Sequence, residues 1–167
     1  LPLFADSLTS LGTSTEDYSD IEDAMKLHTG GVSTMIDVTS DPVNTKPHLY
    51  FRVSGWSLNS KTEHVFDLWK KLLLGTDFQK HSEKLKILIR ALASNNTSAV
   101  AETGHSFARG YAAASFSAAR GISESFNGVE QLQLINRLNS LLDDEESFQR
   151  EVVCLLYTSD AADDGES

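Results

Sequence analysis

The sequence contains a single cysteine, Cys154, among its 167 residues. One cysteine excludes an internal disulfide framework and a zinc site built from several thiolates. Apolar runs are also short, as in residues 72–74, whereas a transmembrane helix needs about 20 apolar residues. We therefore expect no membrane span. The apolar fraction of 40% and the charged fraction of 23% are typical of a globular domain.

Basic residues are scarce relative to acidic ones, with 14 Lys and Arg against 24 Asp and Glu and a net charge of −10. Proteins that bind nucleic acid gain affinity by neutralising phosphates with basic side chains. A basic cluster does occur at residues 80–90, but Glu83 interrupts it. The charge balance therefore argues against a nucleic-acid partner.

Hydrophobic periodicity predicts an α+β fold. Apolar residues alternate over residues 32–38 and again over 49–53, with a turn-rich loop at 40–47, so these runs are expected to pair as antiparallel strands. Helical spacing predicts helices over residues 1–11, 20–29, 61–75, 80–92 and 129–142, and a further one from residue 145. Polar residues 94–98 predict a break, after which residues 99–119 are rich in alanine and expected to be helical.

Helix starts and stops carry local signals. Ser19 with Glu22, and Ser60 with Glu63, match the capping-box pattern that opens a helix. Gly30 and Gly31 lie between a predicted helix and a predicted strand, and one of them is expected to adopt a positive φ. A phosphate-binding loop needs the order strand, glycines, helix, so these glycines are interpreted as a helix end.

No catalytic constellation is visible. The sequence has five histidines but contains neither H-E-x-x-H nor H-x-x-E-H, the two motifs with which helices bind catalytic zinc. His64 and His81 lie in different predicted helices, so each is interpreted as a surface or packed residue. His105 and Ser106 lie in the alanine-rich helix, outside the strand–turn–helix context of a nucleophilic serine. We therefore expect no catalytic residue and no metal ligand here.

The character of the sequence changes at Cys154. Residues 154–164, CLLYTSDAADD, resemble the translation of a sequencing adaptor that has been read into an open frame. The alternative is an ordinary acidic C-terminal segment. We interpret residues 154–167 as an adaptor-derived or disordered tail, which leaves 1–153 as the native part.

Four segments together resemble the pitrilysin-type, inverted-motif zinc metallopeptidases, and among them the presequence proteases of fungal mitochondria. The segments are LPLFADSL (1–8), KLHTGG (26–31), GWSLNSKT (55–62) and GHSFARGY (104–111). The resemblance covers residues 1–153 and implies an α+β domain, the third of four and the first of the C-terminal half. It also implies that this chain is a fragment and that its parent acts in mitochondria, in the matrix or the intermembrane space.

In that family zinc and its bound water hydrolyse unfolded peptides inside a chamber, and the inverted zinc motif lies in the first domain. None of its zinc ligands maps onto this chain. The resemblance thus implies a fragment that is inactive alone, contacts the other domains of the same chain, and supplies chamber wall and scaffold. His28, Gly30 and Gly31 are the expected chamber-wall residues.

Two other interpretations remain open from the sequence. One is a catalytically inactive pitrilysin-fold subunit, of the kind found in the core of a respiratory complex. The other is an independent binding module. The presence or absence of the inverted zinc motif in the parent protein distinguishes the first of these from a protease.

Overall fold

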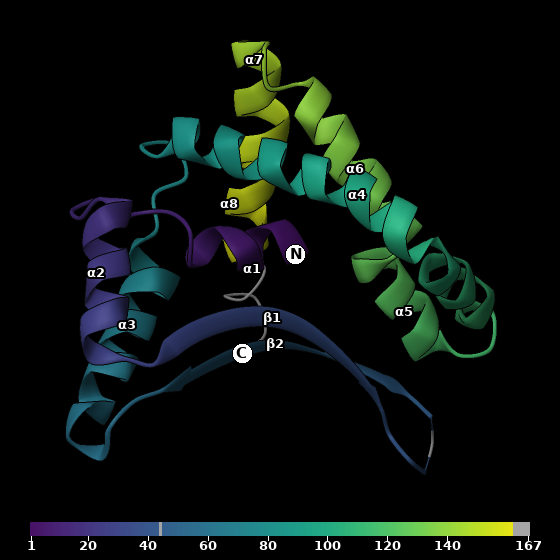
Figure 1. Cartoon of the computed structure of the whole chain (residues 1–167), viewed down its shortest axis with the longest axis horizontal. Coiled ribbons are helices and arrows are strands. Elements are labelled where there is room, and N and C mark those ends of the chain that lie inside the picture. Colours follow the sequence, from purple (N-terminus) through teal and green to yellow (C-terminus); the bar gives the residue numbers. More distant parts are fainter. Residues whose placement is uncertain (44, 162–167) are drawn as a thin grey trace. The chain divides into compact units, whose positions relative to one another are not determined.

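A computed structural model describes residues 1–43 and 45–161 of the chain and shows an α+β fold, as the periodicity predicts (Figure 1). Two strands, β1 (Gly31–Ser40) and β2 (Pro47–Trp56), form a two-stranded sheet. The α-helices are α1 (Pro2–Leu8), α2 (Tyr18–His28), α3 (Thr62–Gly75), α4 (Ser82–Ala114), α5 (Ala118–Asn127), α6 (Val129–Ser140), α7 (Glu145–Ser147) and α8 (Cys154–Ala161). A 3₁₀ turn, η1 (Asn59–Lys61), precedes α3, and a π-helical turn, η2 (Phe148–Val153), precedes α8.

The chain divides into two compact units, each with its own buried residues. The first unit contains Leu1–Met35, Phe51–Leu85 and the described residues from Val153 onward. Its helices α2 and α3 lie side by side, and Ile21 of α2 packs with Val65, Trp69 and Leu72 of α3 (Figure 1). These are the apolar stripes that helical spacing predicts, so the packing follows directly from the sequence.

Helix α1 belongs to the same unit and is buried along one face. The ring of Phe4 lies 5.9 Å from Phe51 of β2 and 5.9 Å from Phe78. The hydroxyl of Thr34 in β1 donates to the carbonyl of Ala5 at 2.6 Å. Aromatic contacts and this hydrogen bond therefore attach α1 to the sheet and hold the start of β1 in place.

The second unit contains Ile36–Tyr50 and Lys86–Val152. Its buried residues include Ile89, Ile135 and Phe148. Lys86, 7% exposed, pairs with Glu145 at 2.7 Å and places its ammonium 4.8 Å from the centre of the Phe148 ring. A buried lysine is stable only when its charge is paired, as it is here.

Several expected helix boundaries are wrong. Residues 94–98 do not break the chain: α4 runs through them, and its non-helical residue is Thr103. Helix α2 is capped by Asp17 with Asp20 three residues on, rather than by Ser19, and the turn η1 replaces the box expected at Ser60. Polar side chains suit several consecutive positions before a helix, so local pattern alone misplaces the cap.

Helix α8 differs from the disorder that the tail of the sequence leads us to expect. Within it, Leu156 is 1% exposed, and the ring of Tyr157 meets Phe78 edge-on at 5.5 Å. Leu156 and Tyr157 therefore pack α8 against the rest of the first unit. Residues 162–167 lie outside the described residues, and the adaptor origin of the tail stays a prediction. None of the described helices is long and apolar enough to cross a membrane.

Candidate functional site: the junction between α2 and β1

The junction between α2 and β1 contains the expected site residues His28, Gly30 and Gly31. Thr29 ends α2, because both its backbone N–H and its hydroxyl donate to the carbonyl of Met25, at 2.9 and 2.7 Å. The N–H of Gly30 then donates to the carbonyl of Trp56 at 2.8 Å. These hydrogen bonds turn the chain from the helix into the sheet within three residues.

Gly31 has a φ of +147°, which confirms the expected positive φ at this pair of glycines. A side chain is strained in that conformation. A Cβ atom at Gly31 would also lie 2.7 Å from Nε1 of Trp56, and one at Gly30 would lie 3.2 Å from the same ring. The indole of Trp56 therefore packs directly on the two glycines, and only residues without a side chain allow this contact.

Trp56 is nevertheless 70% exposed. Together with Gly30, Gly31, Val32 and Ser33 of the junction it lines a shallow hollow of about 410 Å³. This end of the first unit thus presents an aromatic side chain beside accessible glycine backbone. The sequence analysis assigns no role to Trp56, which it includes only in the segment GWSLNSKT. The signal that could have identified it is an aromatic residue directly after a glycine.

Two further apolar side chains, close in sequence to His28 and Trp56, are also exposed. Leu27, the residue before His28, is 67% exposed, and Leu58, two residues after Trp56, is 72% exposed. Large exposed apolar side chains such as these are candidates for contact with another chain. The junction is therefore the candidate contact surface of the first unit.

His28 stacks on His64 of α3, with ring centroids 4.2 Å apart and ring planes 29° apart. Its Nδ1 is buried and has no hydrogen-bond partner among the residues that the structure describes. Burial lowers the pKa of His28 below its usual value of 6.5, and the positive charges that His64 and Lys61 can carry lower it further. The neutral form of His28 is therefore favoured at this site.

The stacked histidines do not form a metal site. Imidazole donates a lone pair in the plane of its ring, so stacked rings do not direct two nitrogens at one ion. In the described part of the chain, no group of three or more His, Cys, Asp or Glu side chains is placed to hold a metal ion. Zinc therefore does not fit the residues of this junction, and no chemical step through a metal is derived from them.

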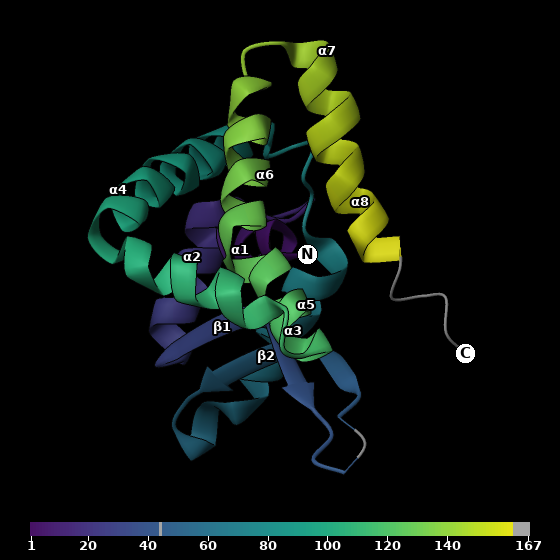
Figure 2. The same ribbon diagram turned by 90° about the vertical axis from the view of Figure 1, so that its right-hand side faces the viewer.

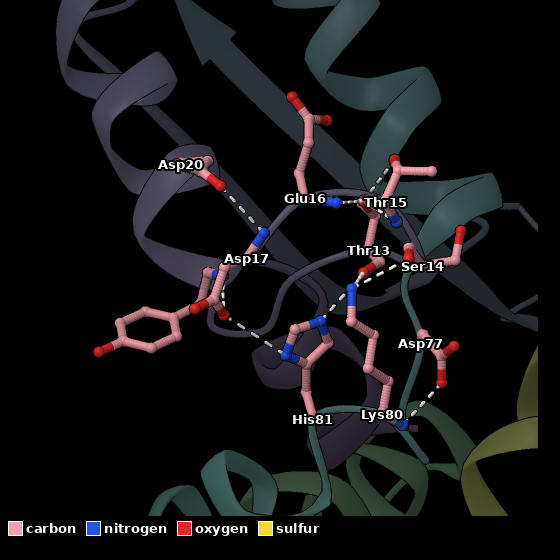
Figure 3. A network of polar contacts seen from close by, with 10 residues as sticks. Thr13, Ser14, Thr15, Glu16, Asp17, Asp20, Asp77, Lys80 and His81 are labelled. Carbon is pink, nitrogen blue, oxygen red and sulfur yellow. Dashed lines mark hydrogen bonds and ion pairs between the residues drawn. The ribbon is translucent and has the colours of Figure 1, made fainter.

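His81 belongs to a separate polar network in the first unit (Figure 3). It is 8% exposed, its Nε2 lies 3.0 Å from the carbonyl of Thr13, and its Nδ1 lies 3.6 Å from the carboxylate of Asp17. Lys80 donates to the carbonyl of Ser14 at 2.9 Å. These contacts hold residues 13–17 against the start of α4. His81 is therefore a packed residue, one of the two interpretations given from the sequence.

The remaining motif from the sequence, Gly104–Ser106, lies inside α4. It has the helical context that the sequence predicts, without the strand and tight turn that expose a nucleophilic serine. His105 on this helix is exposed. The structure therefore brings His28, Gly30 and Gly31 together with Trp56 and His64, and it leaves His81 and His105 elsewhere.

Comparison with known proteins identifies the family. A family model for the domain associated with peptidases of family M16, subfamily C, matches residues 1–138, a range that includes the whole junction. This chain belongs to that peptidase-associated family.

Curated relatives of this peptidase-associated chain carry the name of a protease. This chain is 65% identical over 153 residues to "Presequence protease, mitochondrial" of Saccharomyces cerevisiae, and the match covers 92% of this chain and 16% of that protein. The protein of the same name from Kluyveromyces lactis is 63% identical over 156 residues, covering 93% of this chain and 16% of the relative. The chain therefore spans about one-sixth of the length of these two relatives.

Proposed function

We propose that this chain is a segment of a mitochondrial zinc metalloendopeptidase that degrades presequences and other short unfolded peptides. The observation that carries the proposal is the 65% identity over 153 residues to a mitochondrial presequence protease. Residues 1–153 form the third domain of the parent, at the start of its C-terminal half. The zinc ligands and the general base would lie in the first domain, where a bound zinc ion would supply an activated water for peptide hydrolysis.

In this proposal the segment supplies scaffold and part of the wall of the substrate chamber. The junction supports that role, because the exposed indole of Trp56 lies beside glycine backbone that an extended peptide can approach closely. An unfolded peptide offers apolar side chains and unpaired backbone groups, which match such a surface. His64, the exposed ring of the stacked pair, is the histidine that faces substrate, and His28 holds it in place.

The role of the junction is testable in the full-length protease. His64→Ala and His28→Ala are expected to raise KM for a presequence peptide several-fold, because both disturb the stacked pair. The control is His105→Ala, which removes an exposed histidine from the part of α4 that belongs to the second unit. An unchanged KM in both junction variants, with thermal stability intact, would remove the chamber-wall role.

The assignment of the zinc site to another domain is testable with the chain itself. We expect purified protein of this sequence to bind less than stoichiometric zinc and to leave a presequence peptide intact. Metal analysis and a cleavage assay with and without a chelator measure both properties. Stoichiometric zinc with chelator-sensitive cleavage would overturn the proposed division of roles between domains.

A further inference from the structure

A second hollow, about 290 Å³ in volume, lies within the second unit between α4 and α5. Its wall includes Glu124, which is 9% exposed, together with Ser106, Ser123 and Asn127. Binding sites for whole cofactors and drug-sized ligands are usually about 300–1,000 Å³. This hollow is slightly smaller than that range and suits a single side chain.

Glycines on two sides make room for the carboxylate of Glu124. A Cβ atom at Gly128 would overlap this carboxylate, and one at Gly110 would lie 2.8 Å from its Oε2. Oε1 accepts a hydrogen bond from the backbone N–H of Val129 at 2.9 Å. Val129 is the first residue of α6, the helix that follows α5 along the chain (Figure 2). One oxygen of the carboxylate thus caps the N-terminus of α6.

Among the described residues, the N–H of Val129 is the one hydrogen-bond donor to this carboxylate, and the other oxygen, Oε2, accepts none. The hydroxyls of Ser106 and Ser123 likewise have no hydrogen-bond partner in the described part of the chain. Arg120 also lines the hollow, but its side chain forms no ion pair with Glu124 there. Oε2 is not a fully buried atom, so it is open to a cationic ligand in the hollow, which can donate a charge-assisted hydrogen bond to it.

From this arrangement we propose that the hollow binds the guanidinium group of an arginine side chain in a peptide. Oε2 of Glu124 accepts a charge-assisted hydrogen bond from one arm of the guanidinium. Guanidinium has five N–H donors, and the hydroxyls of Ser106 and Ser123 and the amide oxygen of Asn127 offer acceptors for the others. The net charge of −10 attracts a basic peptide toward the chain.

The peptide part of this inference rests on the proposed function, since mitochondrial targeting peptides are rich in arginine and poor in acids. The hollow would then hold one arginine of the substrate away from the cleaved bond. An amide at position 124 keeps the acceptor for the N–H of Val129 but loses the charge. Glu124→Gln therefore separates a role in binding from a role in capping α6.

The test measures binding by this chain without any cleavage step. A fluorescently labelled peptide of about a dozen residues carries either one arginine or citrulline, its uncharged analogue. We expect unmodified protein to bind the arginine peptide about tenfold more tightly, as for one hydrogen bond to a charged group. Glu124→Gln is expected to bind both peptides equally, at the weaker level.

The matched control is Glu130→Gln, which removes the same charge from an exposed glutamate that accepts a hydrogen bond from Ser125. It should preserve the preference for arginine over citrulline. Arg120→Gln should strengthen binding, because it removes a competing cation. Equal binding of the two peptides by unmodified protein, or equal loss in both glutamate variants, would show that Glu124 only caps α6 and would overturn the proposal. Because no zinc or catalysis is involved, these outcomes do not depend on the cleavage tests.

Discussion

Gly31 shows how one residue fixes the path of the chain at the candidate site. With φ at +147° and Nε1 of Trp56 2.7 Å from the position of a Cβ, Gly31→Ala meets both backbone strain and a steric clash. We expect this substitution to lower the free energy of unfolding by about 1–3 kcal/mol. Urea denaturation of the purified chain measures the change.

Two other glycines serve as controls for Gly31. Gly30→Ala should cost less, because a Cβ there would lie 3.2 Å from a tryptophan that is exposed and can shift. Gly104→Ala, in α4 with no atom within 4 Å of its Cβ, should stabilise the helix by about 0.5–1 kcal/mol. Equal effects at Gly31 and Gly104 would contradict the strained conformation.

His28 makes stability depend on pH. Burial, His64 and Lys61 lower its pKa in the folded chain, whereas the unfolded chain titrates near 6.5. Between the lowered pKa and 6.5 the unfolded state binds more protons, so the free energy of unfolding falls as pH drops below about 6.5. His28→Gln should remove this part of the pH dependence, as urea denaturation between about pH 7.5 and 5 would show.

The control for this pH dependence is His105→Gln, which changes a histidine that is exposed on α4. It should leave the slope of stability against pH as it is in the unmodified chain. If His28→Gln also leaves the slope unchanged, the stacked pair with His64 does not disfavour the charged form of His28.

At the scale of elements, the connection between α5 and α6 depends on Gly128. A Cβ at this position would overlap the carboxylate of Glu124 and would displace it from the N–H of Val129. Gly128→Ala should therefore destabilise the chain by about 1–3 kcal/mol, which is the cost of breaking the hydrogen bond between the N–H of Val129 and the carboxylate of Glu124. Thermal unfolding followed by circular dichroism measures this.

Gly121→Ala is the matched control within α5. Its Cβ would make an ordinary contact, 3.6 Å from the carbonyl of Ala114, so helix propensity should dominate and stability should hold or rise. A loss at Gly121 as large as that at Gly128 would mean that the carboxylate of Glu124 is not what excludes a side chain from position 128.

The elements themselves were largely predictable, because each depends on a pattern within about a dozen residues. Strands β1 and β2 follow the alternation of their apolar residues, and α2, α3 and α6 follow helical stripes. The continuity of α4 through residues 94–98 was missed, since Ser and Asn disfavour a helix only slightly and flanking turns override them. The partners of Trp56 and Glu124 were unpredictable from periodicity, because they depend on where separate elements meet.

At the scale of the whole molecule, composition and motifs give different information. The excess of acidic residues argues against a nucleic-acid partner, and the missing catalytic motifs argue against a catalytic residue. Physical reasoning from single residues names no positive function. Naming a family needed four segments, spread from residue 1 to residue 111, to match together, and the match over residues 1–138 confirms it. His28, Gly30 and Gly31 came from that resemblance, whereas the positive φ at the junction came from backbone chemistry.

The extent of the native molecule is the point on which the sequence and the structure give opposite expectations. An adaptor-derived tail should not pack, yet Leu156 of α8 is 1% exposed. If α8 packs, Leu156→Ala should destabilise the chain by about 2–5 kcal/mol, since it leaves a cavity. For a domain of this size each 1 kcal/mol shifts Tm by about 2–4 °C, so the loss is easily measured by thermal unfolding.

Two further variants decide whether this loss reports native packing. Leu155→Ala, at a position 41% exposed, makes the same chemical change and should cost far less. Deletion of residues 154–167 should lower Tm at least as much as Leu156→Ala, because it also removes the contact of Tyr157 with Phe78. A deletion that leaves Tm unchanged would instead show that the native structure ends at residue 153.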